Sequence, residues 1–243
     1  MTHSIEFNEV TKCFGAQTAL RSVSFSVPTG SIFGLVGLNG AGKTTLIKCV
    51  LNFTFPDSGG VSIFSVPATE AMARSPLAYL PERFIPPSYL TGLEYLQMMS
   101  RLYGVSLTNE RIEAAVAAID LDPKHLSIRV GSYSKGSGQK LGIAAVLLSE
   151  RNLLILDEPM SGLDPRARAC LKAEIKAAHG RGATILFSSH SLGDVEELCD
   201  CFTLLHHGEI RYIGDAAELC ERTGAATLDA AFLKAVEDRH SGS

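Results

Sequence analysis

A glycine-rich loop between two apolar segments constrains the fold of this chain more than any other feature. It follows the apolar run 32–36 and precedes the amphipathic segment 44–51. A buried strand, a glycine-rich turn and a helix in this order open an α/β fold with a mostly parallel sheet. Backbone N–H groups of such a loop surround phosphate at the start of the helix. The residues expected to bind phosphates are Gly37, Asn39, Gly40, Ala41, Gly42, Lys43, Thr44 and Thr45.

Two residues of this loop carry specific chemistry. Lys43 is expected to reach the β- and γ-phosphates of a nucleotide, and the Thr44 hydroxyl is expected to ligate Mg²⁺. The alternative is an ordinary glycine-rich turn before a helix. The strand–loop–helix context favours the phosphate site.

Two adjacent carboxylates end a second apolar run. Residues 153–156 lead directly into Asp157 and Glu158. Carboxylates at the end of a buried strand are costly unless a cation meets them. With a phosphate loop upstream, Asp157 is expected to anchor Mg²⁺ through water, and Glu158 to polarise the attacking water. The alternative is a helix cap beside a solvated charge.

The segment 133–165 joins three elements in a fixed order. The turn Ser134-Lys135-Gly136 opens a helix, the carboxylate pair follows, and a further turn ends at Asp164-Pro165. Together with the phosphate loop, this order resembles the ATP-binding-cassette (ABC) ATPases over nearly all 243 residues. The resemblance implies a single nucleotide-binding domain, 1–243, with a P-loop NTPase core at about 1–82 and 151–243. An N-terminal antiparallel β subdomain and an inserted α-helical subdomain at about 83–150 complete the expected fold.

The resemblance also implies roles for residues outside the loop. His190, after an apolar strand, would contact the γ-phosphate, although a histidine there is more often a solvated loop residue. Phe14 would stack on adenine, and its alternative is a place in the core. Ser134 and Gly136 would cover the nucleotide of a partner subunit. Glu82 would bind Mg²⁺ or water, and its alternative is a solvated charge.

Two positions depart from the family pattern. The usual Leu-Ser-Gly-Gly-Gln signature is Tyr133-Ser-Lys-Gly-Ser137 here, which resembles a subset of export-type members. Glu82 stands where the family usually has glutamine. These departures leave two questions open. One is how strongly the signature closes on the nucleotide of a partner subunit, and the other is how well Glu82 couples the catalytic core to the helical subdomain.

The implied function is that of an ATP-hydrolysing motor. Two such subunits, identical or related, would dimerise around two MgATP molecules and drive a separate membrane permease, with export favoured. The apolar segment 84–90 would receive a cytoplasmic helix of that permease, or else pack in the core. The alternatives are a soluble ABC ATPase acting on ribosomes or DNA, and a regulator that does not hydrolyse ATP.

Composition limits the partners and the location. The formal net charge is −4 and no Lys/Arg-rich run occurs, which argues against a nucleic-acid partner. The N-terminus lacks a signal peptide, and no run of 18 apolar residues is present. We therefore expect a cytoplasmic protein that lies at the membrane through its permease.

Three local predictions can be checked directly. Asp164 should cap a helix that begins at Pro165 and ends near Gly180. Thr108 should cap a helix with Ile112, Ala115, Val116 and Ile119 on its buried face. The segment 57–60, Asp-Ser-Gly-Gly, should form a turn before a strand at 61–64.

Overall fold

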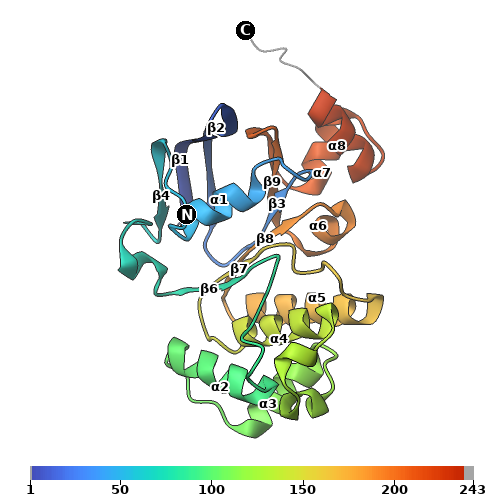
Figure 1. The fold of residues 1–243 in the computed structure, drawn as a ribbon. Coiled ribbons are helices and arrows are strands. Elements are labelled where there is room, and N and C mark those ends of the chain that lie inside the picture. Colours follow the sequence, from blue (N-terminus) through green and yellow to red (C-terminus); the bar gives the residue numbers. More distant parts are fainter. Residues whose placement is uncertain (1, 238–243) are drawn as a thin grey trace. The chain divides into compact units, whose positions relative to one another are not determined.

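The computed structural model describes residues 2–237, which divide into two compact units. The first unit takes in 2–76 and 184–237, and the second takes in Leu77–Ala183. Both units combine helices with strands, and parallel pairs occur in each (Figure 1). The expected α/β class, with an antiparallel sheet and a mostly parallel set of strands, is confirmed.

The first unit holds an antiparallel sheet, a parallel set of strands and four α-helices. Its elements are β1 (His3–Phe14), β2 (Gln17–Pro28), β3 (Ile32–Val36), α1 (Lys43–Val50), β4 (Ser58–Ile63), β5 (Val66–Pro67), the 3₁₀-helix η1 (Ala71–Arg74), β8 (Thr184–Ser189), α6 (Leu192–Leu198), β9 (Cys201–His206), β10 (Glu209–Gly214), α7 (Ala216–Thr223) and α8 (Leu228–Glu237).

Strand β3 lies at the centre of the parallel set. It pairs in parallel with β8 on one side and with β9 on the other, and β10 continues from β9 in antiparallel sense. All five residues of β3 are buried. A strand covered on both faces requires a continuous apolar sequence, which explains why the run 32–36 lacks alternation.

The antiparallel sheet of β2, β1, β4 and β5 buries one face. Phe7 of β1 stacks on Phe25 of β2 with ring centroids 4.4 Å apart, and Phe25 stacks on Phe33 of β3 at 5.6 Å. Large aromatic side chains contribute much of the buried apolar area of a small core. This stack therefore ties the sheet to the central strand.

One local prediction about this sheet is wrong. Residues 58–60 lie inside β4 rather than in a turn, because Gly60 pairs with Asn8 and Ser58 pairs with Thr11. Gly59 has φ +77°, and a Cβ there would overlap the backbone of Asn8 and Glu9. The glycine is thus required by a close approach of two strands at a bulge, and not by a change of chain direction.

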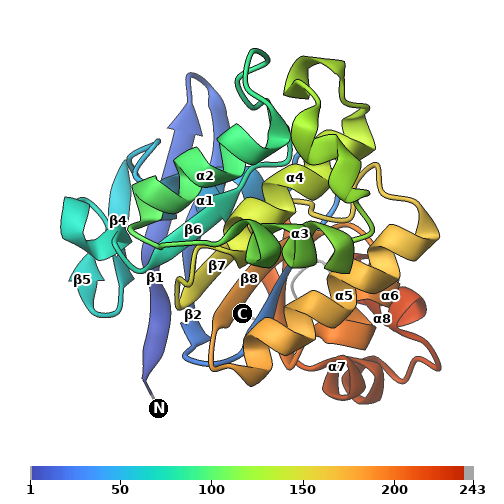
Figure 2. The same cartoon turned by 90° about the horizontal axis from the view of Figure 1, so that it is seen from below.

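The second unit is mainly helical and holds a short parallel strand pair. Its elements are β6 (Leu77–Leu80), α2 (Gly92–Tyr103), α3 (Asn109–Ala118), the 3₁₀-helices η2 (Pro123–Ser127) and η3 (Val130–Ser132), α4 (Lys135–Leu147), β7 (Leu153–Leu156) and α5 (Pro165–Gly180). Helix α3 contacts both α4 and α5, and α4 contacts α2 and β6 (Figure 2). The limits expected for a helical subdomain, 83–150, stay a prediction.

The helix caps of the second unit follow their expected chemistry. Thr108 accepts a hydrogen bond from Arg111 N at the start of α3. Ile112, Val116 and the C-cap residue Ile119 are buried, whereas Ala115 is only half-buried. Asp164 accepts one from Ala167 N at the start of α5, with Pro165 as its first residue. Both cap predictions are confirmed.

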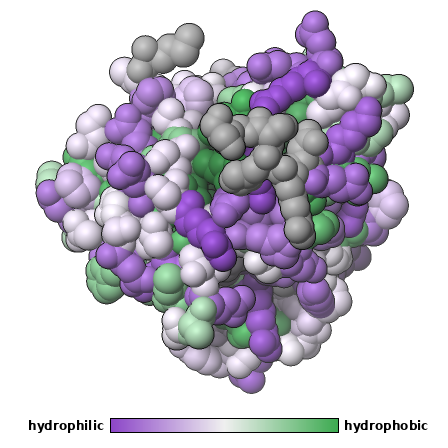
Figure 3. All heavy atoms as spheres, turned by 90° about the horizontal axis from the view of Figure 1, so that it is seen from above, coloured by the Kyte–Doolittle hydropathy of each residue, from purple (hydrophilic) through white to green (hydrophobic). Residues whose placement is uncertain are grey.

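A further feature of the fold is how hydrophobic residues are distributed over one face of the surface and along the helices. On the face drawn in Figure 3, hydrophobic residues form small separate patches among hydrophilic ones. Within 2–237, none of the helices combines the length and the apolar character that crossing a membrane requires.

Candidate functional site

The glycine-rich loop joins β3 to α1 in a conformation that only glycine adopts without strain. Gly40 has φ +81° and Gly42 has φ +112°. A Cβ at Gly42 would lie 2.8 Å from the Ala19 carbonyl oxygen on β2. Gly208 N, in the β9–β10 turn, donates to the Ala41 carbonyl at 3.0 Å. The loop therefore packs against both β2 and the β9–β10 turn.

The start of α1 is suited to an anion. Its N-cap is Gly42, no described side chain caps it, and its first turn holds no acidic residue. Lys43 is 6% exposed, and its Nζ donates to the Gly37 carbonyl at 2.6 Å, so the side chain folds back over the loop. Open amide groups at a helix start beside a buried ammonium group fit a phosphate group.

His190 lies at the edge of the parallel strands where the loop begins. Val36 and Ser189 are paired at the ends of β3 and β8, so Gly37 and His190 follow neighbouring strand ends. Ser191 N donates to Ser189 Oγ at 3.0 Å and shapes the turn that exposes His190. Within the first unit, the structure brings the histidine to the phosphate loop.

Phe14 ends β1 beside the hairpin turn and is 52% exposed. Lys12 Nζ lies 5.5 Å from the centre of its ring, and the ammonium group also contacts Asp57 at 2.8 Å. The alternative of a buried core phenylalanine is therefore excluded. An exposed ring on a strand end can stack on a planar base, and this role stays a prediction.

In the second unit, Asp157 and Glu82 follow neighbouring strands. Leu80 and Leu156 are paired at the ends of the parallel strands β6 and β7, and Asp157 N donates to the Leu80 carbonyl at 2.9 Å. Burial raises the pKa of the Tyr79 hydroxyl, and the charges of Asp157 and Glu82 raise it further. Asp157 is 1% exposed, whereas Glu82 is exposed. Two carboxylates thus share one strand edge.

Glu158 has an unusual backbone for a glutamate. Its φ is +47°, and its carbonyl accepts a hydrogen bond from Ser161 N at 3.0 Å. A non-glycine residue in the left-handed region costs about 1–3 kcal/mol and persists only where its surroundings enforce it. The turn 158–161 supplies that restraint, and the side chain is buried.

Ser134 caps α4, which begins at the predicted turn. Its Oγ accepts from Ser137 N at 3.1 Å and lies 3.0 Å from Ser137 Oγ. The serine at 137 therefore contacts the signature hydroxyl itself. No motif indicated this pairing, because the family pattern has glutamine at that position.

Gly136 faces the turn that precedes α5. A Cβ on Gly136 would lie 3.2 Å from the Gly162 carbonyl oxygen, and the Lys135 side chain lies along Gly162. Asp164, at the end of the same turn, is held by Ala167 N. That hydrogen bond keeps the pKa of the Asp164 carboxyl below its usual range, and the nearby Lys140 ammonium lowers it further.

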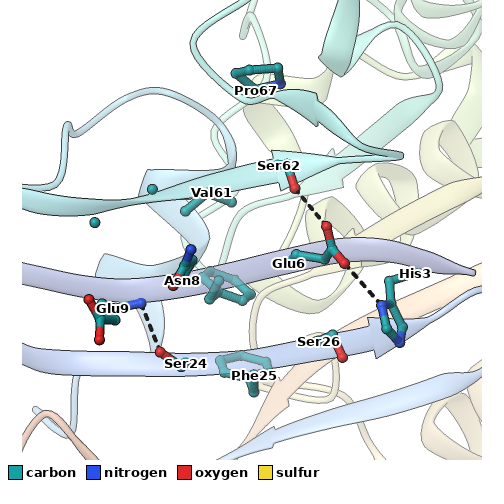
Figure 4. A pocket seen from close by; sticks show the side chains of 13 residues that line it. His3, Glu6, Asn8, Glu9, Ser24, Phe25, Ser26, Val61, Ser62 and Pro67 are labelled. Carbon is teal, nitrogen blue, oxygen red and sulfur yellow. Dashed lines mark hydrogen bonds and ion pairs between the residues drawn. The ribbon is translucent and has the colours of Figure 1, made fainter.

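A hollow in the first unit lies over β1, β2 and β4, apart from all the predicted site residues. It measures about 710 Å³, and in Figure 4 His3 and Glu6 point toward each other inside it. His3 Nδ1 and Glu6 Oε1 are 3.0 Å apart, and Ser62 Oγ donates to Glu6 Oε2 at 3.2 Å. These contacts hold the pKa of Glu6 below its usual range. No sequence motif indicated this hollow, because its lining comes from four separate strands, β1, β2, β4 and β5.

Comparison with known proteins supports the resemblance. The family model described as "ABC transporter" matches residues 20–161. The bacitracin transport ATP-binding protein BcrA of Enterococcus faecalis is 36% identical over 91% of this chain and 72% of its own length. The ABC-type transporter ATP-binding protein EcsA of Bacillus subtilis is 33% identical over 96% of this chain and 97% of its own length.

A solved structure of an ATP-binding subunit of an ABC transporter agrees with the fold. It superposes with a TM-score of 0.89 at 32% sequence identity, covering 96% of this chain and 99% of the other. The family model spans more than half of the 243 residues, and both relatives align over nine-tenths of the chain or more. The chain belongs to the ABC transporter family and is an ATP-binding domain of that family.

Proposed function

We propose that this chain is the ATP-hydrolysing motor subunit of an ABC transporter. The observation that carries the proposal is the start of α1, where the Lys43 ammonium group lies over a loop whose amide groups no described side chain caps. This arrangement binds polyphosphate through backbone donors and one cation. The loop residues, 37–45, would hold the β- and γ-phosphates, and Phe14 would stack on adenine.

The carboxylates would supply the hydrolytic chemistry. Mg²⁺, when bound with ATP, neutralises developing charge on the phosphates. Thr44 and Asp157 would hold it, with Glu82 as a further oxygen ligand. Glu158 would orient the attacking water and accept its proton, and His190 would contact the γ-phosphate. Acidic oxygens and a hydroxyl are the donor set that Mg²⁺ prefers.

Two copies of the chain, or this chain and a related subunit, would complete the sites. Ser134 and Gly136 are exposed or partly exposed at the start of α4, where they are available to a second molecule. Each subunit would bind ATP with its own loop and cover the nucleotide of its partner with its signature. A head-to-tail twofold arrangement closes both sites at once.

The membrane partner would contact the second unit near 84–90. A cavity of about 510 Å³ opens there, lined by residues that include Glu82, Phe84, Ile85 and Gln139. Ile85 and Tyr89 are 71% and 72% exposed. Gln139 Nε2 is buried and has no hydrogen-bond partner within the described part of the chain. Two exposed apolar side chains near a cavity with a buried donor fit a helix end of a permease, and the subunit would then work at the cytoplasmic face of the membrane.

Export is the favoured direction. Among the relatives, one is named for bacitracin transport and another, from Rhizobium etli, for Nod factor export. The signature Tyr133-Ser-Lys-Gly resembles that of export-type members. The substrate would be selected by the membrane subunits.

Steady-state ATP hydrolysis by the Glu158→Gln variant tests the assignment. A general base contributes about 10²–10⁴-fold to a rate, so kcat should fall by that factor while MgATP binding is kept. The matched control is Glu113→Gln, an exposed glutamate on α3 whose loss should leave turnover unchanged. Wild-type turnover in the Glu158→Gln variant would remove Glu158 from the mechanism.

A further inference from the structure

A group of four charged residues joins α4 to the start of α5 in the second unit. Lys140 Nζ donates to the Asp120 carbonyl oxygen at 2.7 Å and to Asp120 Oδ2 at 3.0 Å. It also lies 3.7 Å from Asp164 Oδ2. Arg166 Nε completes the group, 2.9 Å from Asp120 Oδ1. We call these four residues the Lys140 cluster.

Lys140 is the buried member of the cluster. It is 9% exposed, although lysine is among the residues least often buried. Its ammonium group has three donors, and two of them are used on Asp120, one on the backbone and one on the carboxylate. Removing one partner of a buried ion pair leaves an uncompensated charge, so the contact is sensitive to substitution.

Asp120 is fixed in place by its own backbone. It follows α3 with φ +59°, a left-handed conformation that aspartate adopts more readily than most non-glycine residues. Asp120 N donates to Ala117 O at 3.0 Å and Leu121 N donates to Val116 O at 2.9 Å. Ile119 and Leu121 are both buried. The backbone is thus held at the end of α3, and Lys140 and Arg166 contact the two carboxylate oxygens.

The cluster lies one and a half helical turns beyond the signature. Lys140 is the sixth residue of α4, whose first residues follow Ser134, and Asp164 ends the turn that Gly136 faces. The signature helix therefore contacts the turn 158–164 at two places. Gly136 packs against the backbone of Gly162, and the Lys140 ammonium group lies near the Asp164 carboxylate. At its other end, the same turn fixes the carbonyl of Glu158 through Ser161 N.

We propose that Lys140 is a positioning residue that fastens the signature helix to the turn 158–164, so that both move as one piece when the nucleotide site closes. This inference depends on the proposed function, in which the signature covers the nucleotide of a partner subunit. Lys140 itself would touch no nucleotide. When the signature at Ser134 moves onto the nucleotide of the partner subunit, Lys140 would make the backbone of Glu158 in the same chain move with it.

ATP-driven dimerisation, measured by light scattering in a Glu158→Gln background, tests the proposal. Lys140→Met keeps the aliphatic stem and removes the charge, and it should weaken ATP-driven dimerisation and, in the otherwise wild-type chain, lower kcat, each by about tenfold. MgATP binding to the single subunit, measured by titration calorimetry, should stay unchanged, because the phosphate loop belongs to the first unit. Lys140→Arg should restore most of both losses, since it keeps a charged donor.

The matched control is Lys124→Met, an exposed lysine on η2 that should change neither quantity. If Lys140→Met fails to fold, Asp120→Asn is the second variant. It keeps the shape of the Asp120 side chain and removes its charge, so it should also weaken ATP-driven dimerisation. Wild-type dimerisation and kcat in a folded Lys140→Met or Asp120→Asn variant would overturn the inference. Absence of ATP-driven dimers with Lys140 intact would instead overturn the proposed function.

Discussion

Helices α1 and α4 both begin at a turn that the sequence marks as functional, yet their first turns differ. No described side chain caps α1, which starts at Gly42 beside the buried Lys43. The start of α4 is capped by Ser134, whose hydroxyl also contacts Ser137. The first helix therefore begins with amide groups that no described side chain caps, and the second begins with a capping hydroxyl group.

This difference separates two kinds of phosphate contact. A row of free amide groups with a cation can hold an anion within a single subunit. A capped helix start has already used its cap oxygen, so its contribution to a phosphate is one hydroxyl proton and the amide groups beyond the cap. In the proposed function, this contact would be made to a phosphate that a partner subunit already binds. The two helix starts thus fit a binding role and a closing role.

Among the variants that test this comparison of helix starts, the largest effect is expected from Lys43→Ala, which removes the cation from α1 and leaves its backbone amide groups. A hydrogen bond to a charged group contributes about 1.5–3 kcal/mol, so MgATP affinity should fall by roughly 10–150-fold. Titration calorimetry measures it, with the exposed Lys48→Ala on the same helix as control. Unchanged affinity would show that the amide groups bind the phosphates without the Lys43 cation. The cation would then not distinguish the start of α1 from the start of α4.

A middle-sized effect is expected from Ser134→Ala, which makes the start of α4 resemble that of α1. Loss of a serine cap costs about 1 kcal/mol. Urea unfolding followed by circular dichroism should show a lower midpoint, while MgATP binding to the single subunit is kept. Ser132→Ala, in η3 before the signature, should have a smaller effect on the midpoint. If both variants unfold alike, the cap contributes nothing and the two helix starts are equivalent.

The smallest effect concerns the cap of α5 and appears only in acid. The pKa of Asp164 is lowered by the hydrogen bond from Ala167 N and by Lys140. Its contribution to folding is therefore fully present above the usual aspartate pKa and is lost as the pH falls through the lowered value. An asparagine side chain at this position would cap equally well without titrating. Unfolding midpoints of wild type and Asp164→Asn should thus converge, or cross, on moving from neutral pH to about pH 3.

A pH-independent difference between wild type and Asp164→Asn would contradict this account. It would mean that the carboxylate of Asp164 keeps its charge equally in the folded and unfolded chain. The comparison of helix starts would then rest on α1 and α4 alone.

Local chemistry made much of the fold predictable. Strand β3 has the limits expected from its apolar run, and the caps at Thr108, Ser134 and Asp164 lie where short-range patterns put them. Each of these features depends on residues within four positions of one another. The cap contacts can be predicted from the sequence because both partners lie within one helical turn of each other.

Contacts between distant segments were not predictable in this way. Lys140 meets Asp120 across 20 positions, and the ion pair Lys12–Asp57 spans 45. Gly59 lies in a strand because β1 bulges toward it, and no property of the segment 57–60 alone indicates that. Partners of this kind depend on register and packing, which a single sequence does not specify.

The left-handed backbone of Glu158 places opposing demands on one position. Glycine would adopt φ +47° without strain, so a chain selected for thermal stability alone would favour glycine there. In the proposed mechanism Glu158 orients the attacking water, so a chain selected for turnover would have to keep the carboxylate and tolerate the strain. Position 158 is therefore where stability and activity trade off most directly, and drift toward glycine would mark a relative that still binds ATP but no longer hydrolyses it.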